Sequence, residues 1–109
     1  MGKPLPLPVT RAITKLGADL SLARRRRGLS QAMLAERIGS STMTVRRMEE
    51  GKPSISLQHL ARALHVFGEL DRLGNLLDSS EDRIGLTLMD ERVPVRVHVP
   101  KQGKDIGAL

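Results

Sequence analysis

The sequence predicts an all-α domain of five short helices, followed by a short β extension. Apolar residues recur at helical spacing over most of residues 10–77, and serines and glycines stand where helices would begin and end. After residue 82 the apolar spacing changes to alternation. Aromatic residues make up only 1% of the 109 residues, so the core must consist of aliphatic side chains. Such a core suits small packed helices better than a β-sandwich.

The composition divides the chain into four parts. Residues 1–9 repeat X-Pro without helical periodicity and are predicted to form an extended, disordered arm. Residues 10–78 hold the predicted helices, residues 79–100 the β extension, and residues 101–109 a flexible tail. This length is typical of one domain with tails.

The predicted helices follow in order. The first begins at Thr10, and Ser30 caps a second over residues 31–37, which Gly39 ends. The third lies in the stretch RIGSSTMTVRRMEEG, where two serines open it and Gly51 stops it. Ser56 caps the fourth, and a Leu-rich fifth covers residues 68–77. The predicted inner face of the fourth helix consists of Leu57, Leu60, Ala61 and Leu64. Two strands are predicted from Ile84, Leu86 and Leu88, and from Val93, Val95, Val97 and Val99.

The charge is uneven along the chain. The formal net charge is +6 and the pI is about 10.8. Residues 1–52 carry +7, residues 53–92 carry −3, and residues 93–109 carry +2. A basic half backed by a more acidic one indicates a surface for a polyanion, with nucleic acid the first candidate and an acidic membrane the second.

Several classes of protein are not expected. No apolar run approaches the roughly 18 residues of a membrane span, and the N-terminus lacks the pattern of a signal peptide. The absence of cysteine excludes a disulfide framework, and a cytoplasmic, nucleoid-associated location is expected. The histidines His59, His65 and His98 lack the spacing and company of metal ligands, so no metal or cofactor is expected. With no catalytic dyad or phosphate loop visible, we do not expect an enzyme.

Residues 31–48 satisfy the demands of two helices that cross at a tight turn. The first helix needs a small residue at the crossing, supplied by Ala35, and the turn needs a residue that tolerates positive φ, supplied by Gly39. The second helix needs apolar residues against the first, supplied by Val45 and Met48. On a helical wheel the opposite, outward face then consists of Thr42, Met43, Arg46 and Arg47. Arginine can pair with guanine, threonine with several bases, and methionine can contact apolar groups in a major groove.

The stretch LSQAMLAERIGSSTMTVRRMEEGKPSISLQHLARAL resembles the helix-turn-helix of the Xre family, which has the Cro and lambda-repressor fold. The resemblance covers roughly residues 16–77. It implies a protein that binds double-stranded DNA. The implied base-reading residues are Ser41, Thr42, Met43 and Arg47. The implied contacts to the DNA backbone are Gln31, Ser40, Thr44 and Arg46. The implied structural ion pair is Arg24 with Glu49.

The later stretch HVFGELDRLGNLLD…IGLTLMDERVPVRV resembles the C-terminal half of HipB-type antitoxins. This resemblance implies a homodimeric repressor that binds a palindromic operator, autoregulates a type II toxin–antitoxin operon and binds a HipA-like kinase toxin. The alternatives are a stand-alone repressor and an interaction module that has lost DNA binding. Residues 83–99 would be the dimer or partner surface, through Ile84, Leu86, Leu88, Val93, Val95 and Val97, unless they pair within their own chain. Of the run Arg24–Arg27, the last three residues are expected either to complement a helix dipole or to lie near phosphates.

Overall fold

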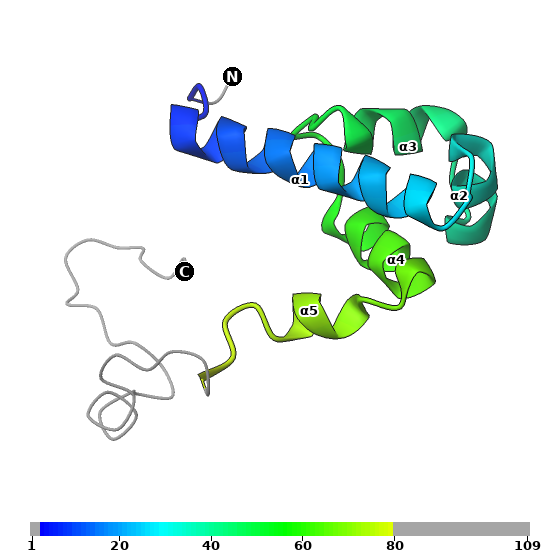
Figure 1. Ribbon diagram of the computed structural model, residues 1–109. Coiled ribbons are helices and arrows are strands. Elements are labelled where there is room, and N and C mark those ends of the chain that lie inside the picture. The colour runs from blue at the N-terminus through cyan, green and yellow to red at the C-terminus, as the bar shows by residue number, and fades with distance from the viewer. Residues whose placement is uncertain (1–2, 80–109) are drawn as a thin grey trace, which may run out of the picture. The chain divides into compact units, whose positions relative to one another are not determined.

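The structure, a computed structural model, describes residues 3–79. These residues form no strand, and they contain five helices, as the sequence predicts (Figure 1). The helices are α1 (Leu7–Arg26), α2 (Gln31–Ile38), α3 (Thr42–Glu49), α4 (Leu57–Phe67) and α5 (Leu70–Gly74). The predicted strands and the tail at residues 101–109 lie outside the described residues. Within residues 3–79 the predicted all-α architecture is confirmed.

Helix α1 begins earlier than the sequence predicts. Its first residue is Leu7, so the prediction of an extended arm is wrong for residues 7–9. The X-Pro pattern suggested extension, but Pro8 lies in the first turn, where a helix needs no backbone N–H from it. The carbonyl of Pro6 accepts from the N–H groups of Val9 and Thr10, at 3.0 and 3.1 Å.

Helices α2 and α3 are bounded by local capping, close to the predicted positions. The Ser30 hydroxyl accepts a hydrogen bond from the backbone N–H of Met33 at the start of α2. Gly39 ends α2 in the left-handed conformation, with φ 68°. Ser41 caps α3, which ends just before Glu50. A turn of three residues therefore separates the two helices.

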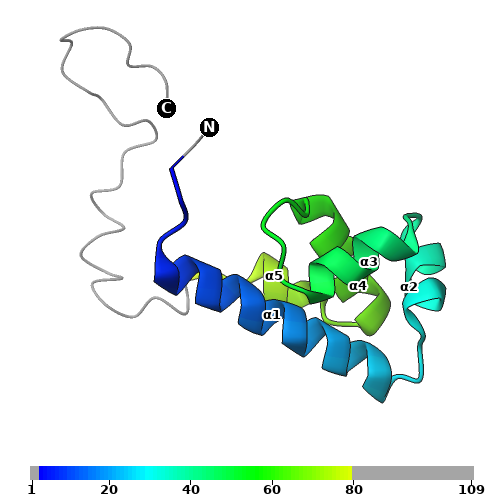
Figure 2. The ribbon, with the colours of Figure 1, turned by 90° about the horizontal axis from the view of Figure 1, so that it is seen from above.

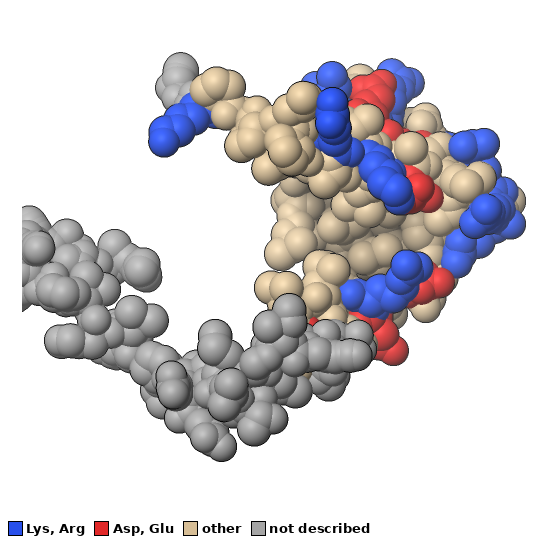
Figure 3. Space-filling view, turned by 60° about the vertical axis from the view of Figure 1, so that its left-hand side comes forward, with Lys and Arg blue, Asp and Glu red and all other residues tan. Residues whose placement is uncertain are grey.

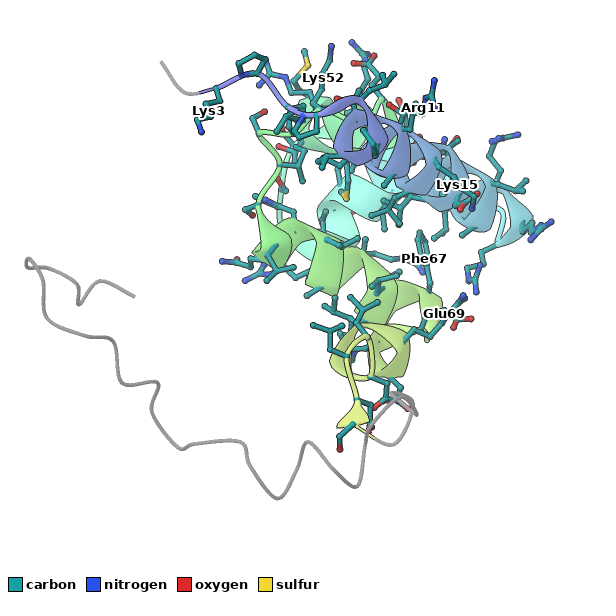
Figure 4. All side chains as sticks on the ribbon, turned by 90° about the vertical axis from the view of Figure 1, so that its left-hand side faces the viewer. Lys3, Arg11, Lys15, Lys52, Phe67 and Glu69 are labelled. Carbon is teal, nitrogen blue, oxygen red and sulfur yellow. The ribbon has the colours of Figure 1, made fainter. Side chains whose placement is uncertain are left out.

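The core lies where the helices converge, and it is almost entirely aliphatic. Figures 1 and 2 show α2 at the C-terminal end of α1 and α3 alongside α1, while α4 packs against α2. Phe67 points from α4 toward α1 (Figure 4). The buried core residues are Leu20, Leu29, Leu34, Ala35, Ile38, Val45, Met48, Ala63 and Phe67.

The buried face of α4 differs from the predicted one. Ala63 and Phe67 are buried, Leu60 and Leu64 are partly buried, and Leu57 is 68% exposed. On a helical wheel centred on Phe67, Leu60 lies about 20° away and Leu57 about 80° away. The buried stripe is therefore centred on Phe67, and Leu57 falls at its edge.

Candidate nucleic-acid interface

Helix α3 has one buried and one exposed face, as the helical wheel predicts. Val45 is 0% exposed and Met48 is 5% exposed, so this face holds α3 on the core. On the opposite face Met43 is 48% exposed. Arg46 and Arg47 are also exposed, and neither guanidinium has a partner among residues 3–79. Both cations are thus free to meet an external anion or hydrogen-bond acceptor.

At the N-terminal end of α3, several of the residues predicted to contact DNA already make hydrogen bonds within the protein. The Ser41 hydroxyl accepts from the backbone N–H of Thr44 at 3.1 Å and lies 3.1 Å from the Thr44 hydroxyl. Ser40 Oγ lies 3.4 Å from Nε2 of His59 in α4. Thr42 is half-buried and makes no such bond within the described chain. Serines 40 and 41 therefore shape the helix start in addition to any contact with DNA.

At its C-terminal end, α3 touches the backbone of α1. Gly17 of α1 is buried, and a Cβ added there would lie 2.7 Å from the Glu49 carbonyl and 2.8 Å from the Met48 carbonyl. Reciprocally, a Cβ on Gly51 would lie 2.8 Å from Cα of Thr14. These two glycines permit a close approach of α1 to the end of α3. This role of Gly17 could not be predicted from the sequence, because a single glycine within a helical pattern carries no local signal of such a contact.

A buried ion pair ties the same two helices. Arg24 donates to both carboxylate oxygens of Glu49, at 2.6 and 3.0 Å, and to the Leu29 carbonyl at 2.8 Å. Gln31 donates to Glu49 at 3.0 Å. The two charged side chains are only 10% and 6% exposed. Glu49 is thus bonded from both α1 and α2, and the Gln31 amide is oriented at the start of α2.

This network shifts the pKa values of both charged groups. Burial would raise the pKa of Glu49, but hydrogen bonds from Arg24 and Gln31, together with the Arg24 charge, lower it below its ordinary range. The hydrogen bond to Glu49 raises the pKa of Arg24, against the opposing effect of burial. Both groups are therefore held in their charged forms.

The rest of the arginine run divides between roles. Arg27 donates to the Ala23 and Phe67 carbonyls at 2.8 and 3.1 Å, and its guanidinium lies 5.0 Å from the Phe67 ring centroid. Nε of Arg25 donates a hydrogen bond to the Ser21 hydroxyl at 3.3 Å. Arg27 therefore joins the ends of α1 and α4, a role that differs from both of those expected for it.

An apolar groove lies between α1 on one side and α4 and α5 on the other. No residue of α3 lines it, so it is a surface distinct from the exposed face of α3. It has a volume of about 480 Å³. Figure 3 shows the uncharged surface between these helices and the Lys and Arg side chains that border it. The apolar lining includes Leu16, Leu20, Leu60, Leu64, Phe67 and Leu73.

The arrangement of α2, the left-handed Gly39 and α3 is that of two helices crossing at a short turn, with the second presenting its outer face. The helix-turn-helix family model matches residues 20–73, from α1 into α5. The chain carries an Xre/Cro-type helix-turn-helix domain. No curated protein and no solved structure gives a match. The helix-turn-helix domain supports a role as a DNA-binding transcription regulator.

Two further observations concern the described part of the chain. No helix within residues 3–79 is long and apolar enough to cross a membrane, and no group of metal-ligating side chains gathers there. The predicted dimer residues Ile84, Leu86, Leu88, Val93, Val95 and Val97 lie outside it.

Proposed function

We propose that this protein is a sequence-specific transcriptional repressor that binds a palindromic operator as a homodimer. The observation that carries this proposal is the exposed face of α3, where Met43 and the unpaired Arg46 and Arg47 lie opposite the buried Val45 and Met48. A helix held in this way can enter a major groove without losing its packing.

The proposed base contacts follow from side-chain chemistry. Arg47 can donate two parallel hydrogen bonds to guanine, and Thr42 and Met43 can meet a base edge or a thymine methyl group. Ser41 belongs to the same set, through the hydroxyl that also caps α3. Arg47 is the strongest candidate, because it is exposed and has no partner within residues 3–79.

The proposed backbone contacts flank this face. The Gln31 amide nitrogen donates to Glu49, and its remaining N–H would donate to a phosphate. The Arg24–Glu49 ion pair would in this way orient a contact to DNA. Ser40, Thr44 and Arg46 would lie beside neighbouring phosphates. These contacts would set the register of α3 without selecting a sequence.

Comparing the binding of a natural duplex with that of a scrambled duplex tests the proposal. Gel shift of the full chain with the DNA upstream of its own gene should give a complex at low salt, and a scrambled duplex should bind more weakly. Arg47→Ala should lower the preference for the natural duplex by about 1–3 kcal/mol, whereas Gln31→Ala should weaken both duplexes alike. No shift at low salt would favour the interaction module. Equal losses on both duplexes for Arg47→Ala would remove that residue from the base-reading set.

We further propose that the chain is the antitoxin of a type II, HipBA-like operon that binds a HipA-like kinase toxin. The support is the sequence resemblance of its C-terminal half to HipB-type antitoxins. The alternative is a stand-alone repressor without a toxin. A neighbouring kinase-like reading frame, whose product copurifies with this protein, would favour the antitoxin, and its absence would favour the stand-alone repressor.

The proposed dimer and partner surface is the apolar set of residues 83–99. A two-fold dimer fixes the distance between two recognition helices, which a palindromic site demands. The compact unit at residues 1–76 precedes this segment, so a chain that ends at Ser80 should keep its helices. It should bind a half-site weakly and no longer dimerise or hold the toxin. If the truncated chain remains a full dimer, the dimer surface lies instead at the exposed Leu70, Leu76 and Leu77 or in the groove beside α5.

A further inference from the structure

Helix α4 contacts the α2–α3 turn through two polar side chains. Arg62 Nη1 donates a hydrogen bond to the Ile38 carbonyl at 2.9 Å. His59, one helical turn before Arg62, places Nε2 3.4 Å from the Ser40 hydroxyl. The two contacts lie on either side of Gly39, the left-handed residue of the turn.

Arg62 satisfies a backbone group that the helix end leaves open. The N–H of Gly39 bonds to the Glu36 carbonyl at 3.2 Å, and the N–H of Ser40 bonds to the Ala35 carbonyl at 2.9 Å. The Ile38 carbonyl is among the last four of α2, which have no partner within the helix. A cation at this point also complements the negative end of the helix dipole.

The guanidinium lies directly against the turn glycine. A Cβ built on Gly39 would be 3.2 Å from Arg62 Nη1. His59 is itself held, because its Nδ1 lies 2.7 Å from the Ser56 hydroxyl that caps α4. The contacts of α4 with the turn thus start from residues fixed by their own helix.

We infer that Arg62, with His59 beside it, is a positioning residue that fixes the α2–α3 turn and so the direction in which α3 presents its exposed face. This inference rests on the proposed function, since it concerns how that face reads DNA. Backbone angles at the turn set the path from α2 to α3, whose N-cap Ser41 follows Gly39 by two residues. A looser turn weakens contacts that need exact geometry more than it weakens contacts to the charged backbone.

The experiment separates positioning from a direct phosphate contact by Arg62, which is exposed. A duplex selected from a random pool by the wild-type protein, and a scrambled version of it, are titrated over a range of salt. The variants are Arg62→Met, which removes the donor but keeps the stem, and Arg62→Lys, which keeps a charged donor. The control is Arg72→Met on α5, which removes one exposed charge, paired with Glu69 at 3.6 Å, away from the turn.

Arg62→Met should lower the ratio of selected to scrambled affinity about tenfold, within the range of one base contact, and leave the salt dependence on scrambled DNA unchanged. Arg62→Lys should restore most of the ratio, and Arg72→Met should leave it unchanged. An unchanged ratio in Arg62→Met would overturn the inference. So would an equal loss on both duplexes with a salt slope reduced by about one, since that marks a lost phosphate contact.

Hydrogen exchange gives a reading that does not depend on DNA. The Ser40 amide, which bonds to the Ala35 carbonyl, should exchange faster in Arg62→Met, while the amides of α1 should keep their wild-type rates. Uniformly faster exchange would show a general loss of stability and overturn the positioning role. If the wild-type protein itself shows no preference for its selected duplex, the proposed function fails instead, before any variant is compared.

Discussion

The two ends of α3 are held by different means. At the N-terminal end, the three-residue turn depends on the left-handed Gly39 and on hydrogen bonds from α4. At the C-terminal end, Gly17 lets α1 approach the α3 backbone, and a buried ion pair joins Arg24 to Glu49. The first end combines local capping with hydrogen bonds from residues 19 and 24 positions away, whereas the second joins residues more than twenty positions apart. The turn and its contacts with α4 thus set the direction of α3, and packing against α1 sets the distance between α3 and α1.

The largest expected effect is at the C-terminal end. Arg24→Met should lower the free energy of unfolding by roughly 3 kcal/mol, because it leaves the Glu49 carboxylate buried without its cation. Urea denaturation measures the loss. Arg25→Met is the matched control, since this neighbouring arginine is exposed and its guanidinium donates to the Ser21 hydroxyl rather than to a carboxylate within residues 3–79. Equal losses in the two variants would show that burial does not distinguish them.

Acidification should weaken the same network without a mutation. Because the folded state lowers the pKa of Glu49, the ionised group stabilises the fold above its ordinary pKa. That stability should disappear as the pH falls from the ordinary pKa through the lower pKa of the folded state. Denaturation of the wild type and of Glu49→Gln across this range isolates the contribution, which the variant lacks. Parallel pH curves for the two proteins would contradict the assignment.

The next largest effect concerns the close approach of α1 to α3. Gly17→Ala should cost about 2–3 kcal/mol, because its Cβ would lie within 2.8 Å of three backbone atoms that cannot rotate away. Gly74→Ala is the control, since nothing lies within 4 Å of a Cβ there. Thermal melts of the two variants compare them directly. A melting temperature for Gly17→Ala equal to that of Gly74→Ala would mean that α1 and α3 separate without cost.

Gly39, at the N-terminal end of α3, can be compared with Gly28, which lies between α1 and α2 and has nearly the same φ. Gly39 has φ 68° and Gly28 has φ 70°, so alanine should cost about 1 kcal/mol at either position. Only at Gly39 does the new Cβ press on Arg62, whereas nothing lies within 4 Å at Gly28. Gly39→Ala should therefore also reduce the preference for specific DNA. Gly39→Val should go further and misdock or unfold the motif. If Gly39→Ala and Gly28→Ala show the same preference for specific DNA, the contact between residue 39 and Arg62 does not set the direction of α3.

The sequence predicts the local contacts at α3 better than the long-range ones, for a physical reason. Ser30 and Gly39 act on residues within a few positions of themselves, so their patterns can be read directly. Gly17 and Arg62 act on backbone far along the chain, and neither stands out from ordinary helix composition. The ion pair of Arg24 was expected only through resemblance to a family.

The α1 start and the α4 face show two further limits of local patterns. Repeated X-Pro indicated extension, yet a proline is tolerated in a first helical turn, and α1 begins at Leu7. The apolar spacing of α4 fits two neighbouring stripes, and only the packing against other helices selects the one centred on Phe67. Periodicity predicted the exposed face of α3, whereas the choice of base-reading residues came from the resemblance to a family.

The smallest expected effect comes from a second ion pair on α1. Lys15 and Asp19 lie 2.7 Å apart, almost as close as Arg24 and Glu49 at 2.6 Å. Their side chains are 78% and 57% exposed, so water and salt screen the attraction, and two mobile chains must be ordered to make it.

Asp19→Asn, which keeps the shape of the side chain and removes its charge, should therefore change the free energy of unfolding by only a few tenths of a kcal/mol. Urea denaturation at low and high salt measures this, and the small difference from wild type should vanish at high salt. A loss close to that of Arg24→Met would mean that the distance between charges sets their contribution. A negligible loss beside the large one for Arg24→Met would show that burial, and not the distance between the charges, sets the cost of removing one partner.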